Sequence, residues 1–490
     1  MRGADTTPAT PARDCRSVTV DVVIPAHNEQ DNIVRCLASV MRQTRQPRTI
    51  VVVDDGSTDG TTVRAREFAE FHGVNVRVVR RFTSIGKTPT IKELARRLDS
   101  DVLFVLDADT LLESDTYIER VVEELYQGVG IASAWGSILP LRERDRRAAD
   151  ALPAARWFAD AHPSDEPLPP KRWWRRLASG ITNTYREVLY LFLQRVVFRG
   201  HMAIFGTVSN PAGCAVAYRR AYLETLFDTV EPQLGDDLTN SEDIFIGLGM
   251  LNEGYRNVQV LDVLARTVEP EVQRLPKQMY LWSSAFLQSA FYFDALLKSP
   301  FKAFKRSRMG RHTSGSGGGL DAMPVPAGSF AFAGEAPAPA SGVFSAMTNL
   351  TAGLPRTRAA AGFAPEFQGR ERRRIQEPYR QAFGSEYTRI YGRPAGWTLL
   401  ASSVEKIAFP TVVLLTLIFR NWEGLFVMIA AETLLAVAAL VVVMKGQRLE
   451  YLVKGIAVTP VRYALLAFEL LTIAQFASDL WLAGNRRWRK

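Results

Sequence analysis

The chain has 490 residues and a formal net charge of +9, and its 47% hydrophobic content is unevenly distributed. Three scattered cysteines are too few for a disulfide framework or a zinc site, which favours a reducing compartment for the soluble part of the chain. A basic chain could bind nucleic acid, but no nucleic-acid-binding motif occurs and arginine clusters flank apolar stretches. We therefore expect a lipid bilayer, and no nucleic acid, as a partner.

Residues 1–17 lack the apolar core of a secretory signal, and we expect them to form a disordered leader. After them, β-branched apolar runs alternate with segments of helical spacing. The runs predict strands at 18–24, 49–53, 74–79 and 102–106, and the spacing predicts helices at 32–43, 63–71 and 91–98. Strands that alternate with helices of this length predict an α/β fold with a doubly wound, mostly parallel sheet.

Two of the predicted strands end in pairs of carboxylates. Asp54 and Asp55 follow the second strand, and Asp107 and Asp109 follow the fourth. Open α/β sheets bind their ligands at the carboxyl ends of the strands. Because carboxylates this close repel one another, we expect a divalent cation there, Mg²⁺ or Mn²⁺, which also holds phosphate oxygens. A solvated turn rich in aspartate is the alternative.

Several well-known site patterns do not occur where they would be needed. No G-x-G-x-x-G or G-x-x-x-x-G-K-[ST] follows the first strand, which disfavours dinucleotide reductases and P-loop proteins. No G-x-S-x-G or Cys/His arrangement indicates a covalent nucleophile. His27 and His201 have no acidic or cysteine partner in a recognisable pattern, so we expect both to be structural.

The polar motifs form an ordered set along the chain. In sequence order they are Pro25-x-x-Asn28-Glu29, Asp54-Asp55-Gly56-Ser57, Gly86-Lys87, Asp107-Ala108-Asp109, the segment at 210–220 that contains Gly213, and Ser241-Glu242-Asp243. This set resembles the family-2 inverting glycosyltransferases of the GT-A fold, in the membrane-bound branch that includes polysaccharide synthases. The resemblance covers residues 18–290 and implies a GT-A catalytic domain at 18–300.

The resemblance implies a site for the donor nucleotide at the ends of the first two strands. Asp55, with Asp54 beside it, would hydrogen-bond the base or the ribose. The loop that contains Pro25, Asn28 and Glu29 would line the same pocket.

The resemblance also implies a metal and diphosphate site after the fourth strand. Asp109, with Asp107 near it, would hold Mg²⁺ or Mn²⁺ bridging the two phosphates, a Lewis acid for the leaving group. Lys87 would be a further cation for the donor, and an exposed loop lysine is the alternative.

Asp243, with Glu242 beside it, is the candidate general base for the acceptor hydroxyl. A base that takes the proton during attack gives a single displacement, and therefore inversion at the anomeric carbon. The alternative for Asp243 is an N-terminal cap of the apolar helix predicted at 244–251, and the two roles are compatible.

The acceptor and diphosphate side is expected to include Gly213, Gln278 and Trp282. Gln278 and Trp282 lie where polymerising members carry Gln-x-x-Arg-Trp, but Leu281 replaces the arginine. The loss of that cation weakens the case for processive synthesis. The alternative is a helix face on which Trp282 belongs to the core.

The rest of the chain predicts a membrane anchor. Residues 182–198 predict a helix that is buried against the domain or lies on the membrane, with burial favoured. Further along we expect a disordered Gly/Pro/Ala-rich insertion at 310–369, a basic amphipathic connector at 370–403, transmembrane or interfacial helices at 404–484 and a basic tail at 485–490. The apolar segments at 404–419, 425–444 and 463–482 predict two or three spans, with the catalytic domain facing the cytoplasm.

Together these features predict a membrane-anchored inverting glycosyltransferase. It would move a hexosyl or N-acetylhexosaminyl group from a nucleotide-diphosphate sugar, in first place a UDP-sugar, to a lipid-linked or envelope glycan acceptor. One alternative is a processive polysaccharide synthase that makes a β-linked polymer. Another is a membrane-tethered nucleotide-sugar-binding or scaffold protein with a degenerate site.

Overall fold

The computed structural model describes most of the chain. The described residues are 15–127, 130–162, 173–234, 241–253, 255–294, 296–301 and 394–482. Residues 1–14 of the predicted leader, the predicted insertion at 310–369, residues 370–393 of the predicted connector and the predicted basic tail at 485–490 lie outside them. The end of the leader forms a short 3₁₀ helix, η1 (Cys15–Ser17).

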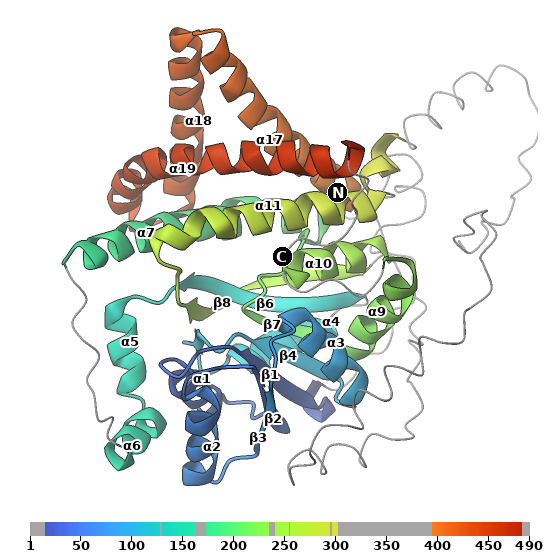
Figure 1. Cartoon of the computed structure of the whole chain (residues 1–490), viewed down its shortest axis with the longest axis vertical. Helices are drawn as coiled ribbons and strands as arrows, with labels where there is room; N and C mark the ends of the chain where they lie inside the picture. Colours follow the sequence, from blue (N-terminus) through green and yellow to red (C-terminus); the bar gives the residue numbers. More distant parts are fainter. Residues whose placement is uncertain are drawn as a thin grey trace, which may run out of the picture. The chain divides into compact units, whose positions relative to one another are not determined.

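Parallel strands form the first half of an eight-stranded sheet (Figure 1). They are β1 (Val20–Ala26), β2 (Thr49–Asp55), β3 (Val76–Arg81) and β4 (Val102–Leu106), in the order β3-β2-β1-β4. The helices between them are α1 (Ile33–Met41), α2 (Thr61–His72) and α3 (Lys87–Arg97). All of β2 and β4 is buried, as expected for central parallel strands with both faces covered. The predicted alternation is confirmed, with boundaries shifted by a few residues.

The second half of the sheet is mixed. Its strands are β5 (Thr110–Leu112), β6 (Ile131–Pro140), β7 (Ala215–Arg219) and β8 (Arg256–Thr267), which complete the order β4-β7-β6-β8-β5. β7 is antiparallel to β4 and β6, β6 is parallel to β8, and β5 is antiparallel to β8. The predicted α/β sheet is therefore a GT-A-like mixed sheet. The short apolar run of β7 carries no sign of its direction, so the sequence pattern could not predict this pairing.

The antiparallel pairs determine which segments meet at the carboxyl end of β4. Leu106 of β4 lies opposite Ala215 of β7, so the residues just before β7 lie beside those just after β4. Thr110 of β5 lies opposite Thr267 of β8, so the end of β8 lies beside Asp109. Segments from distant parts of the sequence are thereby brought to one edge of the sheet.

A continuous hydrophobic core joins the two halves, with members from strands β1, β4, β6 and β7. The helices packed around the sheet include α4 (Tyr117–Gln127), α5 (Glu143–Asp150), α6 (Pro153–Ala161), α9 (Arg220–Leu234) and α10 (Glu242–Asn252). Within the core, the buried hydroxyl of Tyr117 donates to Ala215 O at 3.0 Å and accepts from Gly136 N at 2.8 Å. This side chain ties α4 to β6 and β7 and satisfies both polar groups without water.

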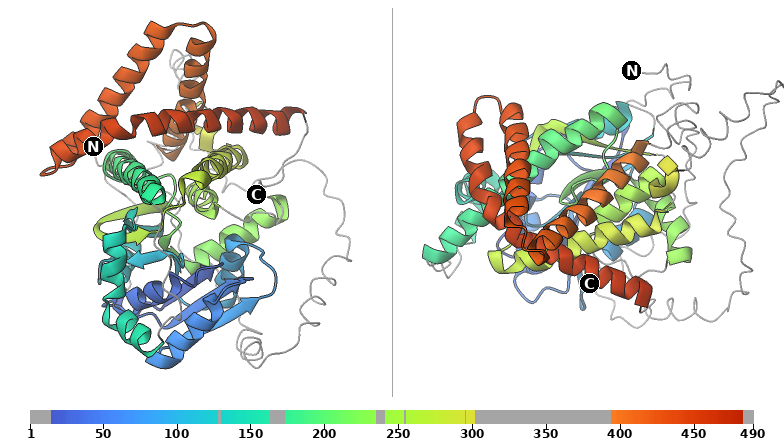
Figure 2. Two further views of the ribbon diagram at one scale, coloured as in Figure 1. Left: turned by 60° about the vertical axis from the view of Figure 1, so that its left-hand side comes forward. Right: turned by 90° about the horizontal axis from the view of Figure 1, so that it is seen from above.

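Further helices form a layer beside the sheet. α7 (Trp173–Phe192) continues through a π-helical stretch, η2 (Leu193–Phe198), into α8 (Arg199–Phe205), and α11 (Leu275–Tyr292) follows β8 after a short 3₁₀ helix, η3 (Val272–Arg274). α19 (Arg448–Ala477), followed by η4 (Ser478–Leu482), lies across α7 and α11 (Figures 1 and 2). Their shared apolar contact is made by Tyr185, Leu275, Val458 and Leu465.

The remaining helices, α17 (Pro394–Ile418) and α18 (Trp422–Val443), form a hairpin that packs on α19 (Figure 2). By length and composition, the described residues contain four candidate membrane spans: 177–205, 396–418, 422–443 and 448–477. The sequence predicts two or three membrane spans. The additional candidate, at 177–205, contains the helix predicted at 182–198. This candidate span is only partly buried, and it exposes Leu177 and Ile181 near its start.

Two boundaries in the helical region differ from the prediction. α17 begins at Pro394 and so includes the end of the predicted connector, because a proline is tolerated in the first turn of a helix. α19 begins at Arg448, well before the predicted 463, because its charged side chains find partners on neighbouring helices. Lys454 pairs with Glu187 of α7 at 3.0 Å, for example.

Candidate active site

The carboxylate of Asp55, at the end of β2, organises the loop after β3. Its hydrogen-bond donors are Ser84 Oγ at 2.7 Å, Gly86 N at 2.8 Å, Ile85 N at 3.1 Å and Arg81 Nη1 at 3.1 Å. Burial opposes ionisation, but these donors outweigh it and hold the pKa of Asp55 below its ordinary value. Asp55 is therefore an ionised anchor for this loop, and its contact with a nucleotide stays a prediction.

Asp54 and Asn28 join the loops after β1 and β2. Asp54 Oδ1 accepts from Ser57 N at 2.9 Å, and its Oδ2 accepts from Thr62 Oγ1. Asn28 has a left-handed backbone with a φ of 57°, donates its N–H to Ser57 Oγ at 2.8 Å and accepts from Thr58 N at 2.9 Å. Pro25 lies within β1 beside these loops. The structure therefore brings the predicted donor-side residues together.

Lys87, the first residue of α3, lies at the centre of the site. Its Nζ is 2.6 Å from Asp107 Oδ1 and 3.0 Å from Glu242 Oε1, and it donates to Gly213 O at 2.9 Å. The displacement of water alone would lower the pKa of Lys87, but the charges of Asp107 and Glu242 raise it well above its ordinary value. Lys87 is therefore not an exposed loop lysine, because its cation joins α3, β4, α10 and the segment before β7.

Asp107, Asp109 and Glu29 form a cluster of carboxylates beside Lys87. The surrounding protein displaces water from Asp109, and with the charges of Asp107 and Glu29 this raises the pKa of Asp109 to about 8. The same loss of water raises the pKa of Asp107, against the lowering effect of Lys87. Among the residues that the structure describes, the hydroxyls of Thr110 and Thr267 make long contacts to Asp109 Oδ1, both at 3.4 Å. The cluster therefore carries more negative charge than its neighbours compensate.

Asp243 is the second residue of α10, and its carboxylate lies against Gly213. Asp243 Oδ2 accepts from Gly213 N at 3.2 Å, and Oδ1 accepts from Ile244 N at 2.9 Å. A Cβ at position 213 would lie 3.1 Å from Asp243 Oδ2, so glycine permits this close approach. Loss of water and the neighbouring Glu242 raise the pKa of Asp243 to about 7. This is the range in which a general base works at neutral pH. The cap residue of α10 is Ser241, so the predicted role of Asp243 as the N-terminal cap is wrong. Asp243 lies in the first turn of the helix, where a carboxylate interacts favourably with the helix dipole.

Gln278 and Trp282 lie on α11 beside a residue that the sequence analysis missed. Arg186 of α7 donates from Nη2 to Gln278 Oε1, and its guanidinium lies 4.6 Å from the centre of the Trp282 ring. Its Nε is 3.4 Å from Glu269 Oε2. No contact described for Gln278 or Trp282 reaches the carboxylates at Asp107 or Asp243.

Sequence reasoning missed Arg81, Arg186 and Glu269. Arg81 is the last residue of β3 and pairs with Asp55. No pattern in the sequence around Arg81 predicts this ion pair. Arg186 had a signal, because it and Glu187 are adjacent charged residues directly before the apolar run at 188–192, where unpaired charges are costly.

The donor set fits a divalent metal bound together with phosphate. No group of three or more His, Cys, Asp or Glu side chains suited to a metal occurs in the described ranges. Asp107 and Asp109 can thus supply only part of a coordination shell, as expected for Mg²⁺ or Mn²⁺ whose other ligands are phosphate oxygens and water. The raised pKa of Asp109 indicates that a cation there would relieve repulsion.

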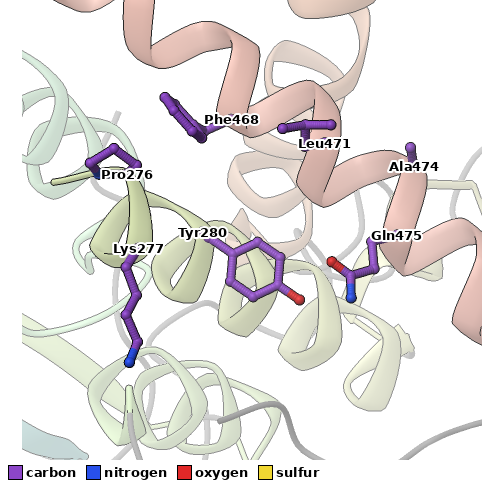
Figure 3. Close-up of a pocket in the computed structure, with 7 residues that line it drawn as sticks. All are labelled: Pro276, Lys277, Tyr280, Phe468, Leu471, Ala474 and Gln475. Carbon is purple, nitrogen blue, oxygen red and sulfur yellow. The ribbon is translucent and has the colours of Figure 1, made fainter. Parts of the chain in front are cut away.

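A pocket of about 530 Å³ lies elsewhere, between α11 and α19 (Figure 3). It is lined by Pro276, Lys277, Tyr280, Phe468, Leu471, Ala474 and Gln475. In Figure 3, Tyr280 extends toward Gln475 and Lys277 extends away from α19. The lining shares no residue with the carboxylate cluster, so the pocket is a feature of the helical layer.

The family described as Glycosyl transferase family 2 matches residues 21–151. The chain carries a glycosyl transferase family 2 domain. The match includes β1 to β4 and the Asp54-Asp55, Lys87 and Asp107–Asp109 motifs, so the resemblance inferred from the sequence is confirmed.

Several bacterial relatives extend the similarity beyond the family 2 domain. An N-acetylglucosaminyltransferase of Azorhizobium caulinodans is 28% identical over 260 residues, which cover 51% of this chain and 55% of that protein. An N-acetylglucosaminyltransferase of Rhizobium leguminosarum bv. viciae is 24% identical over 301 residues, which cover 59% of this chain and 60% of that protein. The matched region spans little more than half the length of these curated relatives.

Among solved structures, a mannosyltransferase of Pyrobaculum calidifontis in complex with GDP-Man and Mn²⁺ is similar to this chain. The sequence identity is 16% and the TM-score is 0.43, over 97% of this chain and 91% of that one.

We expect replacement of Lys87 by methionine to destabilise the protein by about 2 kcal/mol, because it removes a charged hydrogen-bond partner from Asp107 and Glu242. Thermal unfolding of the purified chain in detergent measures the effect. The control is Lys298→Met, whose side chain is 60% exposed and which should change stability by less than about 0.5 kcal/mol. Equal effects of the two substitutions would contradict the central role of Lys87.

Proposed function

We propose that this chain is a membrane-anchored inverting glycosyltransferase that moves a sugar from a nucleotide-diphosphate donor to a hydroxyl of a lipid-linked or glycan acceptor. The observation that carries the proposal is the set of contacts made by Lys87. Its ammonium group contacts Asp107, in the family 2 domain, and Glu242, which is the neighbour of Asp243. One lysine thus contacts both a residue of the candidate leaving-group site and the neighbour of the candidate base, which supports the proposal. The relatives named N-acetylglucosaminyltransferase favour transfer of an N-acetylglucosaminyl group. A UDP-sugar remains the expected donor.

Asp243 would act as the general base. Its carboxylate is held by Gly213 N and Ile244 N, so its orientation is fixed before the acceptor arrives. With a pKa of about 7 it is largely ionised just above neutrality and remains basic enough to take a hydroxyl proton. Removal of that proton as the hydroxyl attacks the anomeric carbon gives single displacement with inversion.

On the donor side, the loop anchored by Asp55 would enclose the nucleoside, with Pro25, Asn28 and Glu29 beside it. Lys87 would contribute positive charge near the departing diphosphate while it keeps Asp107 in place. Asp109 and Asp107 would hold Mg²⁺ or Mn²⁺, which supplies Lewis-acid stabilisation of the leaving group when bound.

A processive polysaccharide synthase is the second candidate, and one observation favours it. Leu281 replaces the arginine expected between Gln278 and Trp282, but the guanidinium of Arg186 contacts both residues. A cation is therefore present at this segment, supplied by α7. Product length separates the candidates, since long β-linked polymer made by the purified chain would favour the synthase.

The direct test of the proposed function is release of UDP from UDP-N-acetylglucosamine by the purified full-length chain. We expect turnover that requires Mn²⁺ or Mg²⁺ and is lost with EDTA and with Asp109→Asn. Turnover of no nucleotide sugar across a panel of UDP- and GDP-sugars, with a glycan and a lipid-phosphate acceptor present, would favour the binding or scaffold alternative.

We expect Asp243→Asn to lower kcat/KM by about 10³-fold, because an amide cannot accept the hydroxyl proton. In the parent chain, kcat/KM should rise with pH through about 7, since the raised pKa of Asp243 leaves the base protonated below that value. The variant should lose this acidic limb. Asp262→Asn, which alters an exposed aspartate paired with Arg120, is the control and should keep both rate and profile. The profiles are measured with Mn²⁺ saturating at every pH, so that protonation of Asp109 does not limit the rate. An acidic limb that persists in Asp243→Asn under this condition would assign the base elsewhere.

We further propose that α17 and α18 cross the bilayer as a hairpin while α19 lies at its cytoplasmic surface. Phe426, Leu434 and Leu435 of α18 are each at least 70% exposed, which is costly in water and favourable in lipid. α19 carries Lys454, which pairs with Glu187 of α7 at 3.0 Å, and a spanning position would draw this pair into hydrocarbon.

This topology also accounts for the basic residues. With two spans, the basic residues that begin at Lys445, those of α19 and the arginines at 486–490 all lie on the side of the catalytic domain. Three spans would place one of these clusters outside, against the usual positive-inside distribution.

Cysteine labelling tests the topology. In a chain without its natural cysteines, Glu423→Cys, near the turn of the hairpin, should react with a membrane-impermeant maleimide added to intact cells. Gln447→Cys, between α18 and α19, should react only after the membrane is opened. Labelling of both or of neither in intact cells would contradict a two-span hairpin.

A further inference from the structure

Helix α7 carries two adjacent charged residues whose side chains are both buried. The exposed fraction is 0% for the side chain of Arg186 and 9% for that of Glu187. A buried charge is costly unless it is paired, and breaking such a pair destabilises a protein strongly. The partners of these two residues therefore indicate what α7 holds in place.

Arg186 connects the segment after β8 with α11. Its Nε lies 3.4 Å from Glu269 Oε2, its Nη2 donates to Gln278 Oε1, and its guanidinium lies over the ring of Trp282. The side chain of Glu269 is 2% exposed and also hydrogen-bonds Tyr190 of α7. Both ends of the segment between β8 and α11 are thus attached to one turn of α7.

The segment held by Arg186 begins next to the carboxylate cluster. Thr267, at the end of β8, is paired with Thr110 and donates from its hydroxyl to Asp109 Oδ1 at 3.4 Å. Val268 N donates to Asp109 O at 3.2 Å. Glu269 is the next residue. A displacement of Glu269 would therefore move the residues that set the backbone and side chain of Asp109.

The neighbouring Glu187 attaches the same turn of α7 to α19. Glu187 Oε1 accepts from Tyr451 Oη at 2.8 Å and lies 3.0 Å from Lys454 Nζ. It also pairs with Arg142, in the loop after β6. Arg186 and Glu187 thus link the helical layer on one side to the residues around Asp109 on the other.

We propose that Arg186 is a positioning residue for Asp109. Through its ion pair with Glu269 it fixes the end of β8 against Asp109, and so sets the geometry with which this carboxylate binds the metal. The inference rests on the proposed metal–diphosphate function. In this role Arg186 itself contacts neither the donor nor the acceptor.

The test compares variants in which a buried ion pair is replaced as a unit. Arg186→Met combined with Glu269→Met removes both charges, which avoids an unpaired charge and is often tolerated. The matched control is Arg220→Met with Glu224→Met, a pair of similar burial at 2.8 Å within α9 that does not contact the site. Mn²⁺ binding to each full-length protein in detergent, with UDP present, is measured by electron paramagnetic resonance of the free ion.

We expect the Arg186/Glu269 variant to bind Mn²⁺ about tenfold more weakly than the parent, as is typical when a residue that orients a metal ligand is lost. The Arg220/Glu224 control should bind as the parent does. Arg186→Lys keeps the positive charge, so it should bind Mn²⁺ more tightly than the Arg186/Glu269 variant and more weakly than the parent.

Unchanged Mn²⁺ affinity in the folded Arg186/Glu269 variant would overturn the positioning role. If that variant does not fold, Glu269→Gln replaces it, because this substitution keeps the shape and removes only the charge. Parental Mn²⁺ affinity in Glu269→Gln would overturn the role equally. A parent chain that does not bind Mn²⁺ with UDP would instead refute the proposed metal site itself.

Discussion

The site depends on one ammonium group among carboxylates. Lys87 Nζ contacts Asp107, Glu242 and the carbonyl of Gly213, so one cation holds together the start of α3, the end of β4, the start of α10 and the segment before β7. These elements are far apart in the sequence, and without Lys87 the acids of two of them, Asp107 and Glu242, would repel one another. The same cation holds Asp107 beside Glu242, the neighbour of the candidate base Asp243. The proposed chemistry needs such an arrangement, because a leaving group and an attacking hydroxyl must be aligned on one anomeric carbon.

Negative charge in this cluster exceeds what Lys87 compensates. The pKa of Asp109 is raised to about 8 and that of Glu29 is also raised, both because water is displaced and because neighbouring acids repel. Such a cluster costs stability in the unliganded protein and favours the binding of a cation. Asp55 shows the opposite case, since its hydrogen-bond donors keep it ionised and its pKa low. The low pKa of Asp55 fits a carboxylate that anchors a loop, whereas the raised pKa of Asp109 fits a carboxylate that would bind a cation.

Much of the first half of the fold could be predicted from the sequence, because buried parallel strands are continuous apolar runs and their ends carry the polar motifs. β4 was predicted with its observed boundaries, and Asp55, Asp107 and Asp109 lie at strand ends as expected. The direction of β7 could not be predicted, since a short run of apolar residues looks the same in either direction. The role of Lys87 was left open because its partners lie 20 and 155 residues away. The cation at Gln278 was missed because it comes from α7, a contact that only the packing of helices reveals.

The central claim is that Asp243 acts as the base of a single displacement. The anomeric configuration of the first product formed from UDP-N-acetylglucosamine, observed by proton NMR before any equilibration, tests it most directly. The α-linked donor should give a β-linked product. An α-linked product would contradict the account, because it requires either two displacements or attack from the leaving-group side, and neither is compatible with a base at Asp243 acting opposite the diphosphate.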